Sequence, residues 1–164
     1  MHVSRPALAV SLFAALAAAS SAGARPGSTV NVCRLLTAKQ VAAVPGVSSA
    51  CTNAKPMAGP GSTIYSGNWR GKTATSARLQ VTVSSYTDQG MLALAKRNLK
   101  QGLPGTPRKV VGIGNGAYEA TGAGSEAIHV AIGKYVVAVV VNTSGKLPRT
   151  AVIEAVAREI AARL

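Results

Sequence analysis

The strongest constraint on the fold is the alternation of apolar and polar residues between positions 78 and 86. The apolar members of this pattern are Leu79, Val81 and Val83. Successive side chains of a strand point to opposite faces, so the pattern predicts a strand with one face on a core and one in water. Further strands are predicted at 64–65 (where Gly67 and Asn68 interrupt the pattern), 117–121, 127–132 and 135–142, with turns at Asn115-Gly116 and Gly133-Lys134. Such strands favour an antiparallel sheet, and the apolar run 135–141 is expected at its centre.

Three helices are expected beside these strands. Thr37 and Gln40 have the spacing of a capping box for a short helix that ends at Pro45-Gly46. A second helix is expected over 88–101 and a third over 150–164. The apolar face of the third helix contains Ile153, Val156, Ala157, Ile160 and Leu164. The predicted fold class is α+β, a single antiparallel sheet packed by the two longer helices, with a short disulfide-tethered N-terminal helix.

Residues 1–24 have the features of a secretory signal peptide. Arg5 lies in a basic start, residues 7–19 are apolar and small, and cleavage is expected after Ala24 or Ala22. The apolar run is shorter than the roughly 20 residues that span a bilayer, and no second run follows. We therefore expect an exported protein, periplasmic or extracellular, with no transmembrane segment in the mature chain. Residues 25–32 are expected to form a flexible N-terminal segment and 33–164 a single domain.

Cys33 and Cys51 are the only cysteines of the chain. In an exported protein the default for such a pair is a disulfide, and a redox pair or a metal site is the alternative. A metal site would need two further ligands, and His129 is the only histidine after the signal peptide. We predict a disulfide, and neither a metal nor a cofactor.

Positive charge is the property of the sequence that most suggests a function. The formal net charge is +13, and Lys96, Arg97, Lys100, Arg108 and Lys109 fall within 14 residues that contain no acid. Arg70, Lys72 and Arg78 form a smaller group. These residues are candidates for anion binding through salt-sensitive electrostatic attraction, with a solvated basic face as the alternative. Nucleic acid is a less expected partner, because few aromatic residues are interleaved with the cations.

Catalytic side chains are scarce. The acidic residues are Asp88, Glu119, Glu126, Glu154 and Glu159. A hydrolase would have to combine His129 with Glu119 or Glu126 and a serine, so no catalytic residue is assigned. A third hypothesis, a small-ligand carrier, would need a deep apolar pocket behind the sheet. Residues 66–73 miss the phosphate-binding P-loop pattern by one glycine and are predicted to form a hairpin turn.

Several short segments have the layout of a known group of domains. These segments are Cys33–Thr37, Val41–Gly46, Cys51-Thr52, Val111–Tyr118 and a final helix that ends at Leu164. Together they resemble small secreted bacterial domains of unknown function, which open with a C-x-L-L-T helix and carry a second cysteine before the first strand. The resemblance implies an α/β sandwich similar to the photosystem oxygen-evolving accessory proteins. It implies no activity, and the chain lacks the lipid-attachment motif that many such domains carry.

Taken with the charge, these features predict an exported, non-catalytic binding or accessory module of the bacterial cell envelope. The expected partner is an anionic envelope component, such as a phospholipid headgroup, lipopolysaccharide or a cell-wall polymer, or else an acidic protein. A secreted hydrolase using His129 and a small-ligand carrier stay open as alternatives.

Overall fold

The structure is a computed structural model that describes residues 29–73, 76–145, 147–148 and 150–164. The predicted signal peptide, residues 1–24, lies outside the described residues, as do residues 25–28 of the predicted N-terminal segment. The elements in chain order are η1 (Val32–Arg34), α1 (Ala38–Ala42), β1 (Cys51–Asn53), β2 (Met57–Gly59), β3 (Ser62–Arg70), β4 (Arg78–Tyr86), α2 (Gln89–Arg97), β5 (Arg108–Val110), β6 (Gly116–Gly122), β7 (Ser125–Ile132), β8 (Tyr135–Asn142) and α3 (Thr150–Arg163).

The eight strands form one antiparallel sheet in the order β1-β3-β4-β8-β7-β6-β5, and β2 pairs with the first half of β3. β8 lies in the middle of this order, as its apolar sequence predicts. The β7–β8 hairpin turns through Gly133 and Lys134, and Gly133 has φ +53°, which suits a tight turn. The predicted antiparallel sheet is thus confirmed.

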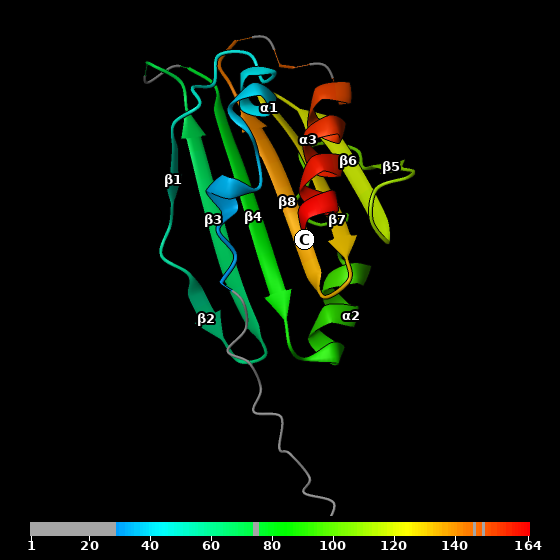
Figure 1. Ribbon diagram of the computed structural model, residues 1–164. Helices are drawn as coiled ribbons and strands as arrows, with labels where there is room; N and C mark the ends of the chain where they lie inside the picture. The colour runs from blue at the N-terminus through cyan, green and yellow to red at the C-terminus, as the bar shows by residue number, and fades with distance from the viewer. Residues whose placement is uncertain (1–28, 74–75, 146, 149) are drawn as a thin grey trace, which may run out of the picture.

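One face of the sheet carries the main hydrophobic core. In Figure 1, η1, α1 and α3 lie on the viewer's side of the sheet, and α3 crosses β7 and β8. The fully buried strand residues on this face include Leu79, Val81, Ile128 and Val139, and α3 packs on them with Ile153, Val156, Ala157 and Ile160. The predicted apolar face of α3 is therefore confirmed. Val32, the last residue of the predicted N-terminal segment, is 1% exposed in the same core.

The other face of the sheet is covered only in part. Leu99 follows α2 and is buried, and its carbonyl lies 3.0 Å from Nδ1 of His129 on β7. His129 alternates with the core residues Ile128 and Val130, so α2 and the segment after it cover the face opposite α3. At the far side of the sheet, β1, β3 and β4 leave this second face open to solvent. We call that area the open face.

The predicted arrangement of helices needs correction. The described residues form three α-helices, of which α2 has nine residues and ends at Arg97, so only α3 is long. Strands make up most of the described fold. The amide of Asn98 donates to the carbonyls of Leu94 and Ala95, which tightens the last turn and stops the helix before Gln101. The short helix α1 has the predicted capping box between Thr37 and Gln40.

The sequence signal for strands fails at β1, β2, β5 and most of β3. The prolines and glycines of residues 53–62 predict a loop, yet these residues hold the end of β1 and all of β2, two edge strands without an apolar face. β3 continues through Gly67 to Arg70. A Cβ at Gly67 would lie 2.9 Å from the Cγ1 atom of Val32, so this position needs glycine because of its packing against η1. The glycine lets η1 approach the sheet closely and does not end the strand.

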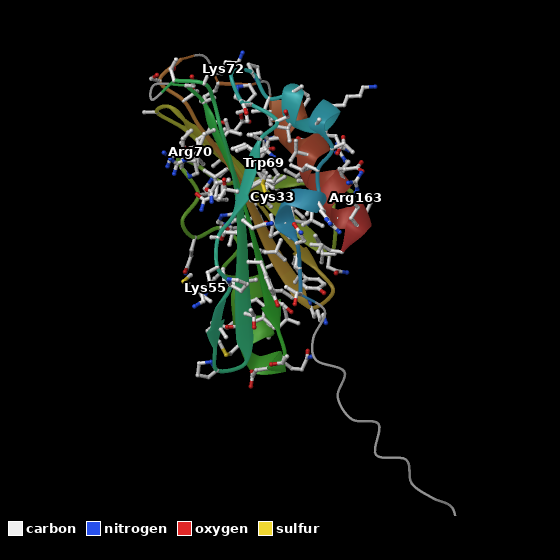
Figure 2. All side chains as sticks on the ribbon, turned by 60° about the vertical axis from the view of Figure 1, so that its left-hand side comes forward. Cys33, Lys55, Trp69, Arg70, Lys72 and Arg163 are labelled. Carbon is white, nitrogen blue, oxygen red and sulfur yellow. A yellow bond between two sulfur atoms is a disulfide. The ribbon has the colours of Figure 1, made fainter. Side chains whose placement is uncertain are left out.

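The disulfide between Cys33 and Cys51 is present and ties η1 to β1. Cys51 is the register partner of Trp69, which is 1% exposed, so the covalent link lies beside the largest core side chain. Figure 2 shows Cys33 and Trp69 close together on this side of the sheet.

Replacing both Cys33 and Cys51 with serine is expected to lower the free energy of unfolding by about 3 kcal/mol. The bond links residues 18 positions apart, and its loss frees that loop in the unfolded chain. Urea unfolding followed by the fluorescence of Trp69 measures the change, since the indole leaves a buried site. An unchanged urea midpoint in the double variant would show that the tether does not stabilise the fold.

Candidate functional site

All five acidic residues lie within the described part of the chain, where they cap a helix, form ion pairs or are buried. The carboxylate of Asp88 caps α2 by accepting from the amide of Met91. Glu154 pairs with Arg108 and Arg158, and Glu159 with Arg163. Glu119 and Glu126 are buried between the sheet and α3. Among the described basic side chains, only Arg108, Arg158 and Arg163 form ion pairs with these acids.

Two of the predicted anion-binding residues, Lys100 and Lys109, lie beside Tyr118, and two more, Lys96 and Arg97, lie in the last turn of α2. The amine of Lys100 lies 4.9 Å from the centre of the Tyr118 ring. Lys109 is the register partner of Tyr118 on β5 and projects from the same face. Lys96 and Arg97 lie one helical turn before Lys100 and complete this group. We call Lys96, Arg97, Lys100 and Lys109 the α2 patch.

Arg108, the fifth member of that predicted group, is held on the opposite face. It contacts the carboxylate of Glu119, its register partner, and lies 3.2 Å from Oε1 of Glu154. The hydrogen bond and the charge of Glu119 raise the pKa of Arg108 above its usual value. Arg108 thus forms ion pairs within the protein. Its partners Glu119 and Glu154 lie 11 and 46 positions away in sequence.

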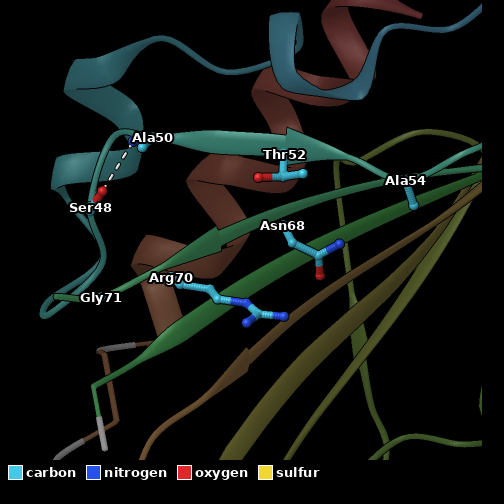
Figure 3. Close-up of a pocket in the computed structure, with 7 residues that line it drawn as sticks. All are labelled: Ser48, Ala50, Thr52, Ala54, Asn68, Arg70 and Gly71. Carbon is cyan, nitrogen blue, oxygen red and sulfur yellow. Dashed lines mark hydrogen bonds between the residues drawn. The ribbon is translucent and has the colours of Figure 1, made fainter. Parts of the chain in front are cut away.

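The smaller predicted group lies at the other end of the molecule. Arg70 ends β3 and Lys72 follows it in the connection to β4, at the end of the sheet away from α2 (Figure 2). Arg70 also lines a pocket of about 550 Å³ at the edge formed by β1 and β3. The other lining residues are Ser48, Ala50, Thr52, Ala54, Asn68 and Gly71, as Figure 3 shows.

The sheet does not bring together the residues that the hydrolase hypothesis requires. Glu119 and Glu126 project to the core face, whereas His129 projects to the face covered by the segment after α2. The sheet thus separates His129 from the two carboxylates that a hydrolytic triad would use. Burial lowers the pKa of His129 from its usual value, so the ring is neutral at pH 7.

The remaining hypotheses concern metals, carriers and membranes. The described residues contain no cluster of His, Cys, Asp and Glu that could hold a metal ion. The pocket beside Arg70 is lined by polar and small side chains, unlike the deep apolar cavity that a carrier of apolar ligands needs. No helix within the described ranges is long and apolar enough to cross a membrane.

Glu126, which the sequence suggests only as a possible partner of His129, is an unusual buried group. It is 2% exposed, and neither carboxylate oxygen has a hydrogen-bond partner of good geometry. Burial raises the pKa of Glu126, Thr150 opposes this effect, and the charges of Glu119 and Glu154 add to it. The alternation along residues 125–132 places Glu126 on the core face, but only the fold shows that no basic side chain among the described residues forms an ion pair with it.

Comparison with known protein families, curated proteins and solved structures finds no match. The resemblance to small secreted bacterial domains therefore stays a prediction. The functional argument rests on the geometry of this chain alone.

Glu126→Gln is expected to stabilise the fold by about 1 kcal/mol or more at pH 8 and to have little effect at pH 4. The pKa of Glu126 is higher in the folded than in the unfolded chain, so both states hold the proton at low pH. As pH rises through the folded-state pKa, the wild-type carboxyl costs stability that glutamine does not. Urea unfolding at both pH values measures the difference.

Glu159→Gln is the matched control for this experiment. Gln40 and Arg163 lower the pKa of the half-buried Glu159, so the substitution is expected to destabilise the fold at pH 8. An equal effect of Glu126→Gln at pH 4 and pH 8 would contradict an ionisation cost at Glu126.

Proposed function

We propose that this protein is an exported, non-catalytic binding or accessory module of the bacterial envelope that attaches to an anionic surface through the α2 patch. The observation that carries the proposal is the position of the acidic side chains, which lie away from the basic residues of the α2 patch. Asp88 caps the start of α2, three glutamates are ion-paired and Glu126 is buried in the core, so the cations of the α2 patch form no ion pair with any of the five acids.

The surroundings of the α2 patch suit a surface rather than a deep ligand. Leu94 is 58% exposed and Met91 is 40% exposed on the same helix, next to the basic residues. Exposed apolar side chains beside cations favour contact with a layer that offers anionic groups above an apolar interior. An anionic phospholipid surface is therefore the partner that we propose first, ahead of lipopolysaccharide, a wall polymer or an acidic protein.

Export supports the same proposal. The disulfide is a bond typical of oxidising compartments, and the predicted signal peptide leads there. Outside the cytoplasm the abundant polyanions include lipid headgroups and wall polymers, which a basic surface attracts in a salt-dependent manner.

Reversing the charges of Lys96, Arg97 and Lys100 to glutamate is expected to weaken binding to phosphatidylglycerol vesicles by about 100-fold at low salt. Each basic residue near an anionic membrane contributes about 1 kcal/mol, and the introduced carboxylates add repulsion. Vesicle co-sedimentation at several salt concentrations measures the affinity, which should fall as salt rises for the wild type.

A variant with Arg34, Lys39 and Lys55 changed to glutamate is the matched control. It alters the net charge by the same amount on η1, on α1 and between β1 and β2, away from the α2 patch. Equal losses in both variants would show that net charge alone drives binding. Wild-type binding that ignores salt, or a triple α2 variant that binds normally, would overturn the proposal.

A further inference from the structure

Two arginines face one another across neighbouring strands on the open face. Arg70 on β3 and Arg78 on β4 are register partners, so their side chains leave the sheet on the same side. Both side chains are exposed, and neither forms an ion pair with any of the five acids. Like charges placed directly opposite destabilise a sheet, so this pair weakens the fold unless an anion lies between them.

The open face offers hydrogen-bonding groups and no acid. β1, β3, β4 and β8 contain no Asp or Glu. Beside the arginine pair, Thr52, Asn68 and Gln80 are partners in register across three strands and project from the same face. Figure 3 shows the side chains of Asn68 and Arg70 leaving the same side of β3.

The backbone around the pair is held in place. The amide of Ser48 donates to the carbonyl of Arg70 at 3.1 Å, and the amide of Gly71 donates to the carbonyl of Ala77 at 2.9 Å. A Cβ at Gly71 would overlap the carbonyl oxygen of Gly46 and the side chain of Ser76, so only glycine lets these loops pack together. The two arginines therefore lie at strand ends whose backbone is hydrogen-bonded, which lowers the entropy cost of binding.

Two hollows meet at Arg70. One is the pocket of about 550 Å³ along β1 and β3, and the other, of about 330 Å³, is lined by both arginines and the small residues of the β3–β4 connection. Lys72 lines a further hollow beside them. A ligand that fits has an anionic group at the arginine pair and a small polar body along Thr52 and Asn68.

We propose that Arg70 and Arg78 bind a phosphate group carried on a small polyol or sugar. Each guanidinium presents a planar fork of donors, and a tetrahedral phosphate has enough charge and acceptor oxygens for two forks, whereas one carboxylate is satisfied by one. This site extends the proposed function. Only the source of the phosphate depends on that function.

The test is binding of inorganic phosphate and of glycerol 3-phosphate to the full mature protein by calorimetry at constant ionic strength. Wild type is expected to bind glycerol 3-phosphate more tightly than inorganic phosphate, because the polyol reaches the larger hollow. Arg70→Lys with Arg78→Lys keeps both charges but removes the forks, and it is expected to lower the affinity about tenfold. Wild-type affinity in this variant, or no binding by wild type, overturns the inference.

A second readout does not depend on a ligand. Arg70→Gln alone is expected to raise the thermal midpoint in phosphate-free, low-salt buffer, because it removes the repulsion from Arg78. Added phosphate is expected to stabilise wild type and to have little effect on this variant. A lower midpoint for Arg70→Gln in phosphate-free buffer would show that the pair is not strained, which also counts against the inference.

Vesicles separate this inference from the proposed function. If the paired lysine variant binds phosphatidylglycerol vesicles normally but has lost glycerol 3-phosphate, the site takes a soluble phosphate. If vesicle binding also falls, the phosphate is that of the headgroup. Both results support the site, whereas failure of the α2 patch variant to lose vesicle binding contradicts only the proposed function.

Discussion

The rest of the structure depends on the burial of one face of the antiparallel sheet. Alternate residues of β4, β7 and β8 form that face, and α3 and η1 close it with Ile153, Ile160 and Val32. Burial of such side chains contributes about 25 cal/mol per Å² of apolar surface, which is the main favourable term in folding. Gly67 permits the close approach of Val32, and the disulfide holds η1 in place beside Trp69. The packing of the core face thus depends on a glycine and a disulfide as well as on apolar side chains.

The same burial sorts the charges of the molecule. Glu119 and Glu126 lie on the covered face, and Glu154 and Glu159 lie on the helix above it. No acid occurs on the four strands from β1 to β8 in the sheet order, so the open face carries arginines, amides and hydroxyls but no carboxylate. Four of the five acids thus lie on or above the covered face and Asp88 caps α2, which leaves two basic surfaces, the α2 patch and the Arg70–Arg78 pair, without an ion pair to any acid. Charge asymmetry of this kind attracts polyanions at a distance and lets local geometry select among them.

Elements with a complete local signal could be predicted from the sequence, and elements that depend on distant contacts could not. The alternation along 78–86, the capping box at Thr37 and the apolar face of α3 are each contained in a few neighbouring residues, and all three were confirmed. The sequence suggests that Gly67 interrupts a strand, because the residue that requires a glycine there, Val32, lies 35 positions earlier. Arg108 read as a free cation because its partner Glu154 lies 46 positions away. Arg70, Lys72 and Arg78 were grouped by nearness in sequence, and only the register of β3 and β4 shows that two of them oppose each other.

Uncompensated positive charge has a cost that the fold must offset without acids. The two opposed arginines repel each other, and so do the cations at the end of α2. Salt or bound anions relieve the repulsion within each group. The disulfide and the apolar core do not depend on charge, so they keep the domain folded while its basic surfaces stay unpaired. Neutralising these cations internally would need carboxylates on β3, β4 or α2, and those carboxylates would compete with any external anion. The absence of acids from these strands is thus the feature that keeps both basic surfaces available to a partner.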